Sequence, residues 1–232
     1  MSLLTIVQKA AVRCGITSPS SAISNADPMV QQLIALAQDE GDESSVNYDW
    51  RNLKIPCQFT GDGTSTLFGL PSDFDRWPTQ ASMYSSSYPL IPLLGPISDE
   101  ELIAMQARPV FPVRPFWNML GGSLQVWPAL QSGEVVSSQY RSNAWILDAD
   151  GVTRKAAWSA DTDTPLIRER IIVAGVIWRW KKATGLDYAE EMKTWGQILE
   201  VESAHDRGNR TVGLANVWNR FPDNSWPGVI VP

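Results

Sequence analysis

The spacing of apolar residues near the beginning of the chain predicts two helices. The first covers Leu3–Cys14, carries its apolar residues on one face, and ends at Gly15. The second starts at Asp27 and Pro28, a capping residue followed by a proline at the first helical position. It continues with apolar residues at helical spacing and runs into the acidic stretch Asp39–Glu43.

Two further long helices are predicted late in the chain. Thr164 and Pro165 repeat the same start signal, so we expect a helix over Leu166–Thr184. Its centre is apolar on nearly every side, which is typical of a helix that neighbours bury. Gly185 is suited to ending it, and another helix should follow from Asp187. One stripe on that last helix consists of Tyr188, Met192, Trp195 and Leu199, so the two helices should form an antiparallel hairpin.

The stretch between these helices has a β-like pattern. From Leu53 to Trp158 it is rich in Gly, Pro and short apolar runs that alternate with polar residues. One short helix interrupts it, because Ser98 and Glu101 have the spacing of a capping box. We expect two hairpins and one further strand: Ile55–Thr60 with Thr64–Gly69, Phe116–Leu120 with Ser123–Trp127, and Glu134–Tyr140 as a third partner.

The predicted fold class is therefore α+β. The N-terminal helices (1–52) and the late helical hairpin (160–207) should pack as one antiparallel helical bundle, with a small antiparallel β domain (53–159) inserted between them. Residues 208–232 are too often interrupted by Gly, Asn and Pro for a helix, and too apolar for a solvated tail. We expect them to form an extended C-terminal arm.

Composition and charge narrow the class of protein. The hydrophobic fraction is 44%, no apolar run approaches the ~20 residues of a membrane span, and the N-terminus lacks the basic region of a signal peptide. Cys14 and Cys57 have no metal-type spacing and fit a reducing compartment. A formal charge of −6 argues against a protein whose main task is to grip phosphates.

The residues that could carry catalysis do not form a recognisable set. The single histidine, His205, lies near the end of a polar helix, and no hydrolase, zinc-protease or nucleotide-binding motif is present. Asp148–Gly151 reads as a turn rather than a calcium loop. Two pairs of nearby carboxylates are candidates: Asp161 with Asp163, which suit a helix N-terminus, and Asp73 with Asp75, which have no obvious partner. We expect no catalytic residue, no metal ligand and no cofactor.

The chain has eleven tryptophans, an unusually large number, and each could lie in the core or at an interface with another chain. Trp178 should lie in the core, whereas Trp180, Tyr188 and Trp195 are candidates for a subunit interface, although the core is the default for Trp195. Trp218 and Trp226 could fold back onto the body or dock on another chain, where tryptophan anchors dominate binding. The acidic residues Asp39, Glu40, Asp42 and Glu43 could form a solvated face or a wall that repels DNA phosphates.

Several stretches together resemble the head-to-tail adaptor proteins of tailed bacteriophages and prophages. Asp161–Trp195, with its W-R-W-K-x-x-x-G-L-D-Y junction, resembles the paired late helices of that family. LPSDFDRW at Leu70–Trp77 resembles a turn after a β-hairpin, and the opening residues with YDW at Tyr48–Trp50 resemble the N-terminal helices. The resemblance covers about residues 1–207 and lies in the order and spacing of these stretches.

The resemblance implies a structural virion protein that is made in the host cytoplasm and works at the head-to-tail junction. Family members form a homo-oligomeric ring, commonly twelvefold, beneath the portal protein. The ring extends the channel for double-stranded DNA and presents a surface to a tail or nozzle protein, with no membrane involved. The C-terminal arm would dock on the portal through Trp218, Phe221, Trp226, Val229, Ile230 and Val231. The four acidic residues Asp39, Glu40, Asp42 and Glu43 are candidates for the channel lining.

Two other function classes remain open from the sequence. A carbohydrate- or receptor-binding virion module could use aromatic residues of the β insertion as stacking platforms, namely Trp77, Tyr84, Tyr88 and Trp117. A glycoside hydrolase would need two convergent carboxylates, and Asp73 or Asp75 offers only one side of such a pair. The adaptor needs the C-terminal arm, whereas a lectin or a hydrolase does not.

Overall fold

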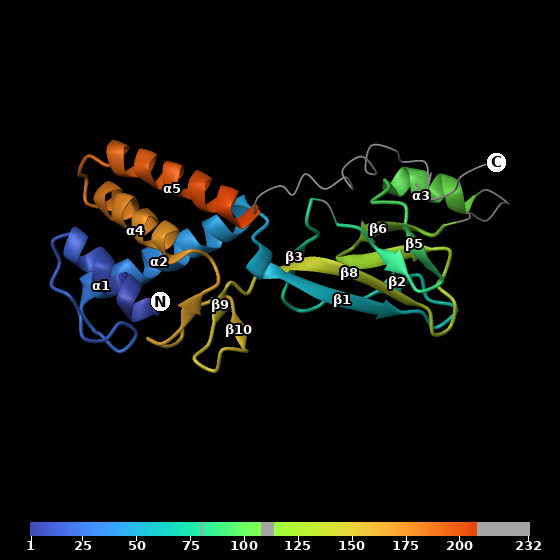
Figure 1. The fold of residues 1–232 in the computed structure, drawn as a ribbon, viewed down its shortest axis with the longest axis horizontal. Helices are drawn as coiled ribbons and strands as arrows, with labels where there is room; N and C mark the ends of the chain where they lie inside the picture. Colours follow the sequence, from blue (N-terminus) through green and yellow to red (C-terminus); the bar gives the residue numbers. More distant parts are fainter. Residues whose placement is uncertain (80, 108–113, 208–232) are drawn as a thin grey trace, which may run out of the picture.

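The protein has two parts that lie end to end along its long axis (Figure 1). The computed structural model describes residues 1–79, 81–107 and 114–207. Four long helices and a small sheet form one part, which we call the helical body; two antiparallel sheets and a short helix form the other, the β body. The predicted α+β class is confirmed. No helix in the described ranges is both long and apolar enough to cross a bilayer.

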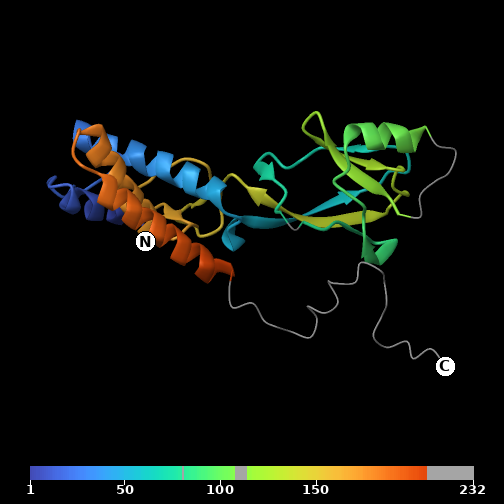
Figure 2. The ribbon, with the colours of Figure 1, turned by 90° about the horizontal axis from the view of Figure 1, so that it is seen from above.

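The helical body is built from both ends of the described chain. Its helices are α1 (Leu3–Arg13), α2 (Pro28–Asn47), α4 (Glu169–Ala183) and α5 (Ala189–Arg207). α4 contacts the other three, and it runs back against α5 as the predicted antiparallel hairpin (Figure 2). Its apolar centre is buried as expected, because Ile171, Ile172 and Val176 are at most 1% exposed. Burial of α4 on most sides is the result of its lack of a polar face.

Of the two helix starts predicted from a capping residue followed by proline, the one at Asp27 is confirmed and the one at Thr164 is wrong. Asp27 Oδ1 accepts a hydrogen bond from the Met29 amide at 3.0 Å, which caps α2. Thr164–Pro165, however, is strand β11 and pairs with β9 (Ile146–Leu147). The Leu166 amide then donates to the Trp145 carbonyl oxygen at 2.8 Å, so the chain stays extended and α4 begins only at Glu169.

The β body contains a five-stranded and a three-stranded antiparallel sheet. The first sheet has the order β1-β8-β4-β5, and β3 also pairs with β8. The second has the order β2-β7-β6, and α3 (Asp99–Gln106) packs against β6. The strands are β1 (Lys54–Thr60), β2 (Leu67–Phe68), β3 (Phe74–Arg76), β4 (Tyr84–Ser85), β5 (Tyr88–Pro92), β6 (Phe116–Leu120), β7 (Ser123–Trp127) and β8 (Val135–Ser142); a 3-10 turn, Arg51–Leu53, precedes them.

One of the two predicted hairpins is confirmed. β6 and β7 pair from Phe116↔Trp127 to Leu120↔Ser123, and the two glycines between them have positive φ, as a tight turn requires. The hairpin of Ile55–Thr60 with Thr64–Gly69 is wrong, because β1 pairs with β8 and β2 pairs with β7. β8 pairs along the whole of β1, whereas β2 has only two residues, so the longer ladder is formed. The predicted third partner, Glu134–Tyr140, therefore corresponds to β8 and lies beside β1 in the five-stranded sheet.

The third sheet belongs to the helical body. It has the order β10-β9-β11, with β10 at Arg154–Lys155. Trp145 and Ile146 are 1% and 0% exposed and lie in the same hydrophobic core as α1, α2 and α4. Trp158 packs edge-on against Trp145, with ring centroids 5.1 Å apart. Residues 144–158, which were predicted as the end of the inserted domain, thus contribute side chains to the helical core.

Candidate functional site

Several residues that the sequence singled out meet where α2, α4 and α5 pack together. Glu40 of α2 is fully buried, and its carboxylate is surrounded by hydrogen-bond donors from all three helices. We call Glu40, Ser44, Arg179 and Trp195 the Glu40 cluster. It ties the N-terminal helices to the late hairpin.

Both oxygen atoms of the Glu40 carboxylate accept hydrogen bonds. Oε1 accepts from Ser44 Oγ at 2.6 Å and from Trp195 Nε1 at 2.7 Å, and Oε2 accepts from Arg179 Nε at 3.0 Å. The Arg179 guanidinium also pairs with Glu43. Burial raises the pKa of Glu40, while the donors from Ser44, Arg179 and Trp195 act in the opposite direction. A carboxylate satisfied in this way is a structural tie between helices.

The glycine at position 175 makes the Glu40 cluster possible. A Cβ atom built on Gly175 of α4 would lie 2.1 Å from Glu40 Cδ and 2.2 Å from Oε2. Gly41 has the same relation to a tryptophan, since its Cβ would lie 2.0 Å from the ring of Trp145. Both glycines lie inside helices, where glycine lowers stability relative to alanine. The close approach of Glu40 and Trp145 therefore accounts for them.

The acidic run is divided by the structure. It lies within α2 rather than at a helix end, and only Asp39, Asp42 and Glu43 are exposed. Asp42 Oδ1 accepts from Trp145 Nε1 at 2.7 Å, and Glu43 pairs with Arg179. A signal for Glu40 was available in the sequence: it follows Leu33 and Ala37 at seven and three residues, which places it on the same buried face of the helix.

The three candidates for a subunit interface all make contacts within the chain. Trp195 is half-buried and binds Glu40, and Trp180 is half-buried against the helical core. The ring of Tyr188 is tilted against Trp178, with centroids 6.3 Å apart. Trp178 itself is buried, as expected. Trp195 thus links α5 to α2, Tyr188 packs the turn before α5 onto α4, and Trp180 adds to the helical core.

A second buried charge joins the helical body to the β body. Arg141 of β8 is fully buried, and its guanidinium donates to the carbonyl oxygens of Val46 and Tyr48 at 3.3 and 3.4 Å. It also lies 3.1 Å from a carboxylate oxygen of Asp75. Asp49, two residues after the end of α2, pairs with Arg76 of β3 at 3.0 Å. The junction is thus an ion-pair network rather than a flexible linker.

The predicted stacking platforms of the β body are mostly internal. Trp117 is 2% exposed, and Trp77 packs against it at 6.0 Å as well as against Phe74 at 5.1 Å. Tyr84 and Tyr88 are 42% and 39% exposed. Tyr84 lines a groove of about 400 Å³ on the outer face of the five-stranded sheet. Only the two tyrosines keep the exposure that stacking on a sugar requires.

The carboxylates considered as pairs have separate structural partners. Asp73 Oδ1 accepts from Tyr140 Oη at 2.7 Å, while Asp75 faces Arg141, so the two serve different contacts. Asp161 and Asp163 do not lie at the start of α4 as expected. Asp161 accepts from the Ala22 and Ile23 amides, which fixes the loop between α1 and α2.

Asp163 is a fully buried carboxylate beside a lysine. Its Oδ1 lies 2.7 Å from Lys155 Nζ, and its Oδ2 accepts from the amides of Ser159 and Ala160. Burial acts to raise the pKa of Asp163, but these partners outweigh it and hold the pKa below its usual value. Asp161 and Asp163 therefore bind different groups and do not form a carboxylate pair.

The single histidine and the two cysteines differ in their exposure to solvent. The side chain of His205 is 70% exposed, and its Nδ1 is 4.0 Å from Glu202. Burial raises the pKa of both Cys14 and Cys57 to about 11, which keeps these free thiols protonated near neutral pH. Within the described ranges, no group of three or more His, Cys, Asp or Glu residues could hold a metal ion.

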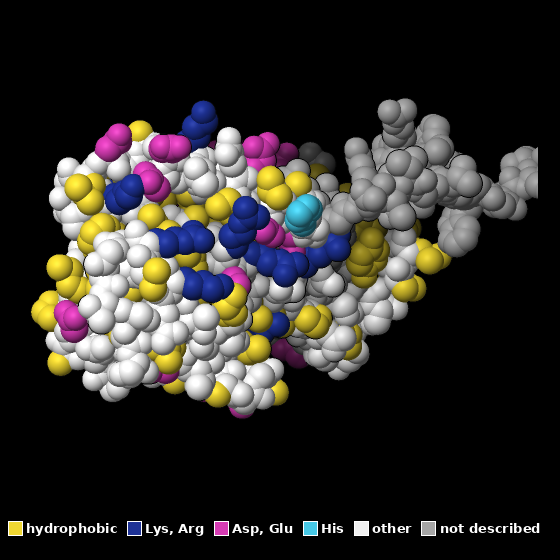
Figure 3. Space-filling view, turned by 60° about the vertical axis from the view of Figure 1, so that its left-hand side comes forward, with side chains coloured by type: hydrophobic (Ala, Val, Ile, Leu, Met, Phe, Trp, Pro, Cys, Tyr) yellow, Lys and Arg dark blue, Asp and Glu magenta, His cyan; other side chains and the backbone are white. Residues whose placement is uncertain are grey.

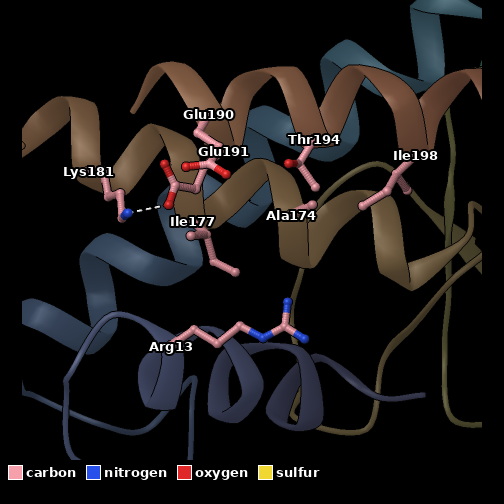
Figure 4. Close-up of a pocket in the computed structure, with 8 residues that line it drawn as sticks. All are labelled: Arg13, Ala174, Ile177, Lys181, Glu190, Glu191, Thr194 and Ile198. Atoms are coloured by element: carbon pink, nitrogen blue, oxygen red, sulfur yellow. Dashed lines mark hydrogen bonds and ion pairs between the residues drawn. The ribbon is translucent and has the colours of Figure 1, made fainter. Parts of the chain in front are cut away.

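Two features mark the outer face of the helical body. Figure 3 shows Lys and Arg side chains gathered in a band that leads to the histidine. Arg168 and Arg170, whose side chains are 73% and 65% exposed, both pair with Glu202, which also lies 4.0 Å from His205. A groove of about 380 Å³ crosses α4 between α1 and α5 (Figure 4), and we call it the α1–α5 groove. Its lining is Arg13, Ala174, Ile177, Lys181, Glu190, Glu191, Thr194 and Ile198.

The predicted portal-docking residues Trp218, Phe221, Trp226, Val229, Ile230 and Val231 lie outside the described residues. No family model matches the chain, and no curated protein matches it.

Proposed function

We propose that this chain is a non-enzymatic subunit of the ring at the head-to-tail junction of a tailed bacteriophage. The observation that most supports the proposal is where the stretches that carry the family resemblance lie. Tyr48–Trp50 and Leu70–Trp77 contain Asp49, Asp75 and Arg76, three members of the ion-pair network at the junction of the two bodies. Trp178–Tyr188 spans the turn between α4 and α5.

These stretches are far apart in the sequence, yet each lies where two helices or the two bodies of the structure meet. A resemblance that includes such contact regions is what a shared arrangement of helices and insertion produces, because residues where elements meet are constrained by packing while surface residues can vary. In the proposed ring, the helical body flanks the DNA channel and the β body faces a tail or nozzle protein. Residues 208–232 dock on the portal through their tryptophan and aliphatic side chains.

The portal contact is tested by a pull-down from phage-producing cells. Full-length protein and a chain that ends at Arg207 serve as baits, bound proteins are identified by mass spectrometry, and the eluate is imaged by electron microscopy. We expect portal protein and rings with the full chain and no portal with the shortened one, whose far-UV and near-UV spectra should be unchanged. Capture of portal by neither bait contradicts the adaptor function, and equal capture by both contradicts the docking role of residues 208–232.

The channel proposal now concerns three acidic residues. Asp39, Asp42 and Glu43 face solvent and would repel DNA phosphates, while Glu40 is internal. Lysine at all three positions should slow DNA packaging or ejection, since an attractive wall would retain the duplex. Asp42 and Glu43 also have partners within the chain, so the unfolding midpoint of the variant is measured alongside. Unchanged rates in a folded variant would show that this surface does not face the DNA.

A glycan- or receptor-binding module has less support. Of the four aromatic residues that would stack on sugars, Trp77 and Trp117 pack inside the β body. A glycan array with full-length protein tests what Tyr84 and Tyr88 could still do. A signal that Tyr84→Ala and Tyr88→Ala abolish would favour that function over the adaptor.

A further inference from the structure

We infer that the α1–α5 groove receives helix α3 of a second copy of the chain. The inference rests on the proposed ring and names its contact surface. It starts from α3, which is attached to its own body through few side chains. Leu102 is its one buried residue, while the adjacent Ile103 is 65% exposed. A helix with apolar residues on two sides is suited to burial on both.

The free side of α3 is a short ridge with one acidic end. Glu100, Ile103, Ala104 and Ala107 are all exposed, and positions 100, 103, 104 and 107 share one face of a helix. The other two acids of the first turn are engaged, since Glu101 closes the capping box with Ser98 and Asp99 accepts from Asn118. Glu100 has no such contact among the described residues, which leaves its carboxylate free for an outside partner.

The α1–α5 groove offers the complementary set of groups. Ala174, Ile177 and Ile198 form an apolar floor, and Figure 4 shows the Arg13 side chain extending along the groove from α1. Lys181 is paired with Glu191 on the α4–α5 side. Arg13 makes no ion pair within the described part of the chain and is the available cation for Glu100.

Glu190, which has no ion pair with any residue that the structure describes, lies on the α5 rim, opposite Arg13 (Figure 4). Because like charges repel, it fixes the direction in which α3 enters: the acidic end of the helix must face α1, with Ile103 over the apolar floor. The fit therefore specifies an orientation as well as a partner.

One molecule cannot fill its own groove. The groove and α3 lie at opposite ends of the long axis in both ribbon views (Figures 1 and 2). The contact therefore joins two different surfaces of two copies, which generates a ring when the rotation closes and a filament when it does not. In a cyclic adaptor such a contact requires the long axis of each subunit to run around the ring, with the two bodies at the same height along the channel.

Site-specific photo-crosslinking tests the contact in the assembled state. Ile103 is replaced by p-benzoylphenylalanine in the full-length chain, in phage-producing cells, and a control probe replaces the 79% exposed Val152. We expect a covalent dimer whose acceptor peptides come from α1, α4 and α5 with the probe at position 103 and not with the control. Absence of this dimer, or acceptors elsewhere on the chain, overturns the inference.

Charge exchange gives a second, independent readout. Arg13→Glu and Glu100→Arg should each lower the dimer yield several-fold, and the double variant should restore it, because the pair is reversed rather than removed. Glu190→Lys is the matched control and should not lower the yield. If the chain with unchanged charges gives no crosslinked dimer while it still captures the portal, the groove contact is rejected and the adaptor function is left standing. A crosslinked dimer without portal capture would support the groove contact and contradict the adaptor function.

Discussion

Replacing Gly175 with alanine separates two opposite expectations about stability. Helix propensity alone predicts that the change stabilises the protein by ~1 kcal/mol, because glycine is unfavourable inside a helix. The structure predicts the reverse. The new methyl group would occupy the position of the Glu40 carboxylate, whose Cδ lies 2.1 Å from the ideal Cβ.

The size of the effect follows from what Glu40 would lose. Its carboxylate would have to move by more than an ångström, away from Ser44, Arg179 and Trp195. Separating a buried ion pair destabilises a protein by ~3–5 kcal/mol. Offset by the propensity gain, Gly175→Ala should lower the free energy of unfolding by roughly 2–4 kcal/mol, or the melting temperature by about 10 °C for a chain of this length.

The measurement is urea unfolding followed by circular dichroism and tryptophan fluorescence. Gly196→Ala on α5 is the matched control, since no atom lies within 4 Å of its ideal Cβ. That variant should be more stable than the natural chain by ~0.5–1 kcal/mol. If Gly175→Ala were as stable as Gly196→Ala, the packing argument for the Glu40 cluster would be refuted.

Three further predictions concern hydrogen bonds and charges. Trp195→Phe removes a donor from a buried carboxylate and should destabilise by ~1–3 kcal/mol more than Trp180→Phe, whose indole N–H is unbonded; equal losses in urea unfolding would contradict it. Arg141→Ala should lower stability by ~3–5 kcal/mol and increase proteolysis between the two bodies, and a protease-resistant variant would count against the junction. Asp163 has a lowered pKa, so its stabilisation is present above about pH 4 and is lost as pH falls through its folded-state value. Asp163→Asn should therefore flatten the dependence of unfolding free energy on pH in this acid range, and an unchanged slope would argue against the Lys155 contact.

Local signals were sufficient where the determinants are close in sequence. The cap at Asp27, the capping box at Ser98 and the two-glycine turn before β7 each depend on residues within a few positions of one another, and all three were predicted correctly. The same holds for Gly185, which has a positive φ of 74° at the end of α4. Such features are set by backbone hydrogen bonds that a short stretch can satisfy by itself.

The errors came from partners distant in sequence. Thr164 and Pro165 have a good helix start signal, but β9 lies nearby and provides a strand partner instead. β1 was assigned to the closest following segment, whereas its partner β8 begins only at Val135. Turn residues indicate that the chain reverses its direction, but they do not identify which strand a given strand pairs with.

The candidate site was partly foreseen. The sequence pointed to Trp195 and to the acidic run, yet it treated that run as one surface. Helical periodicity places Glu40 inward, and its neighbours outward, once α4 is recognised as the partner. Arg179 could not be identified as the counter-charge from the sequence, because two helices separated by more than a hundred residues had to be aligned first.

The way the chain enters and leaves the β body has a consequence for how such proteins can diverge. Entry through β1 and exit through β8 occur at the paired residues Lys54 and Arg141, so both connections lie next to each other. Segments of very different length or fold can be exchanged at that point without altering the distance that α2 and α4 must span. Lengthening such a segment adds little closure entropy, since that penalty grows only with the logarithm of its length. For the helices, the whole β body is the equivalent of a single hairpin loop.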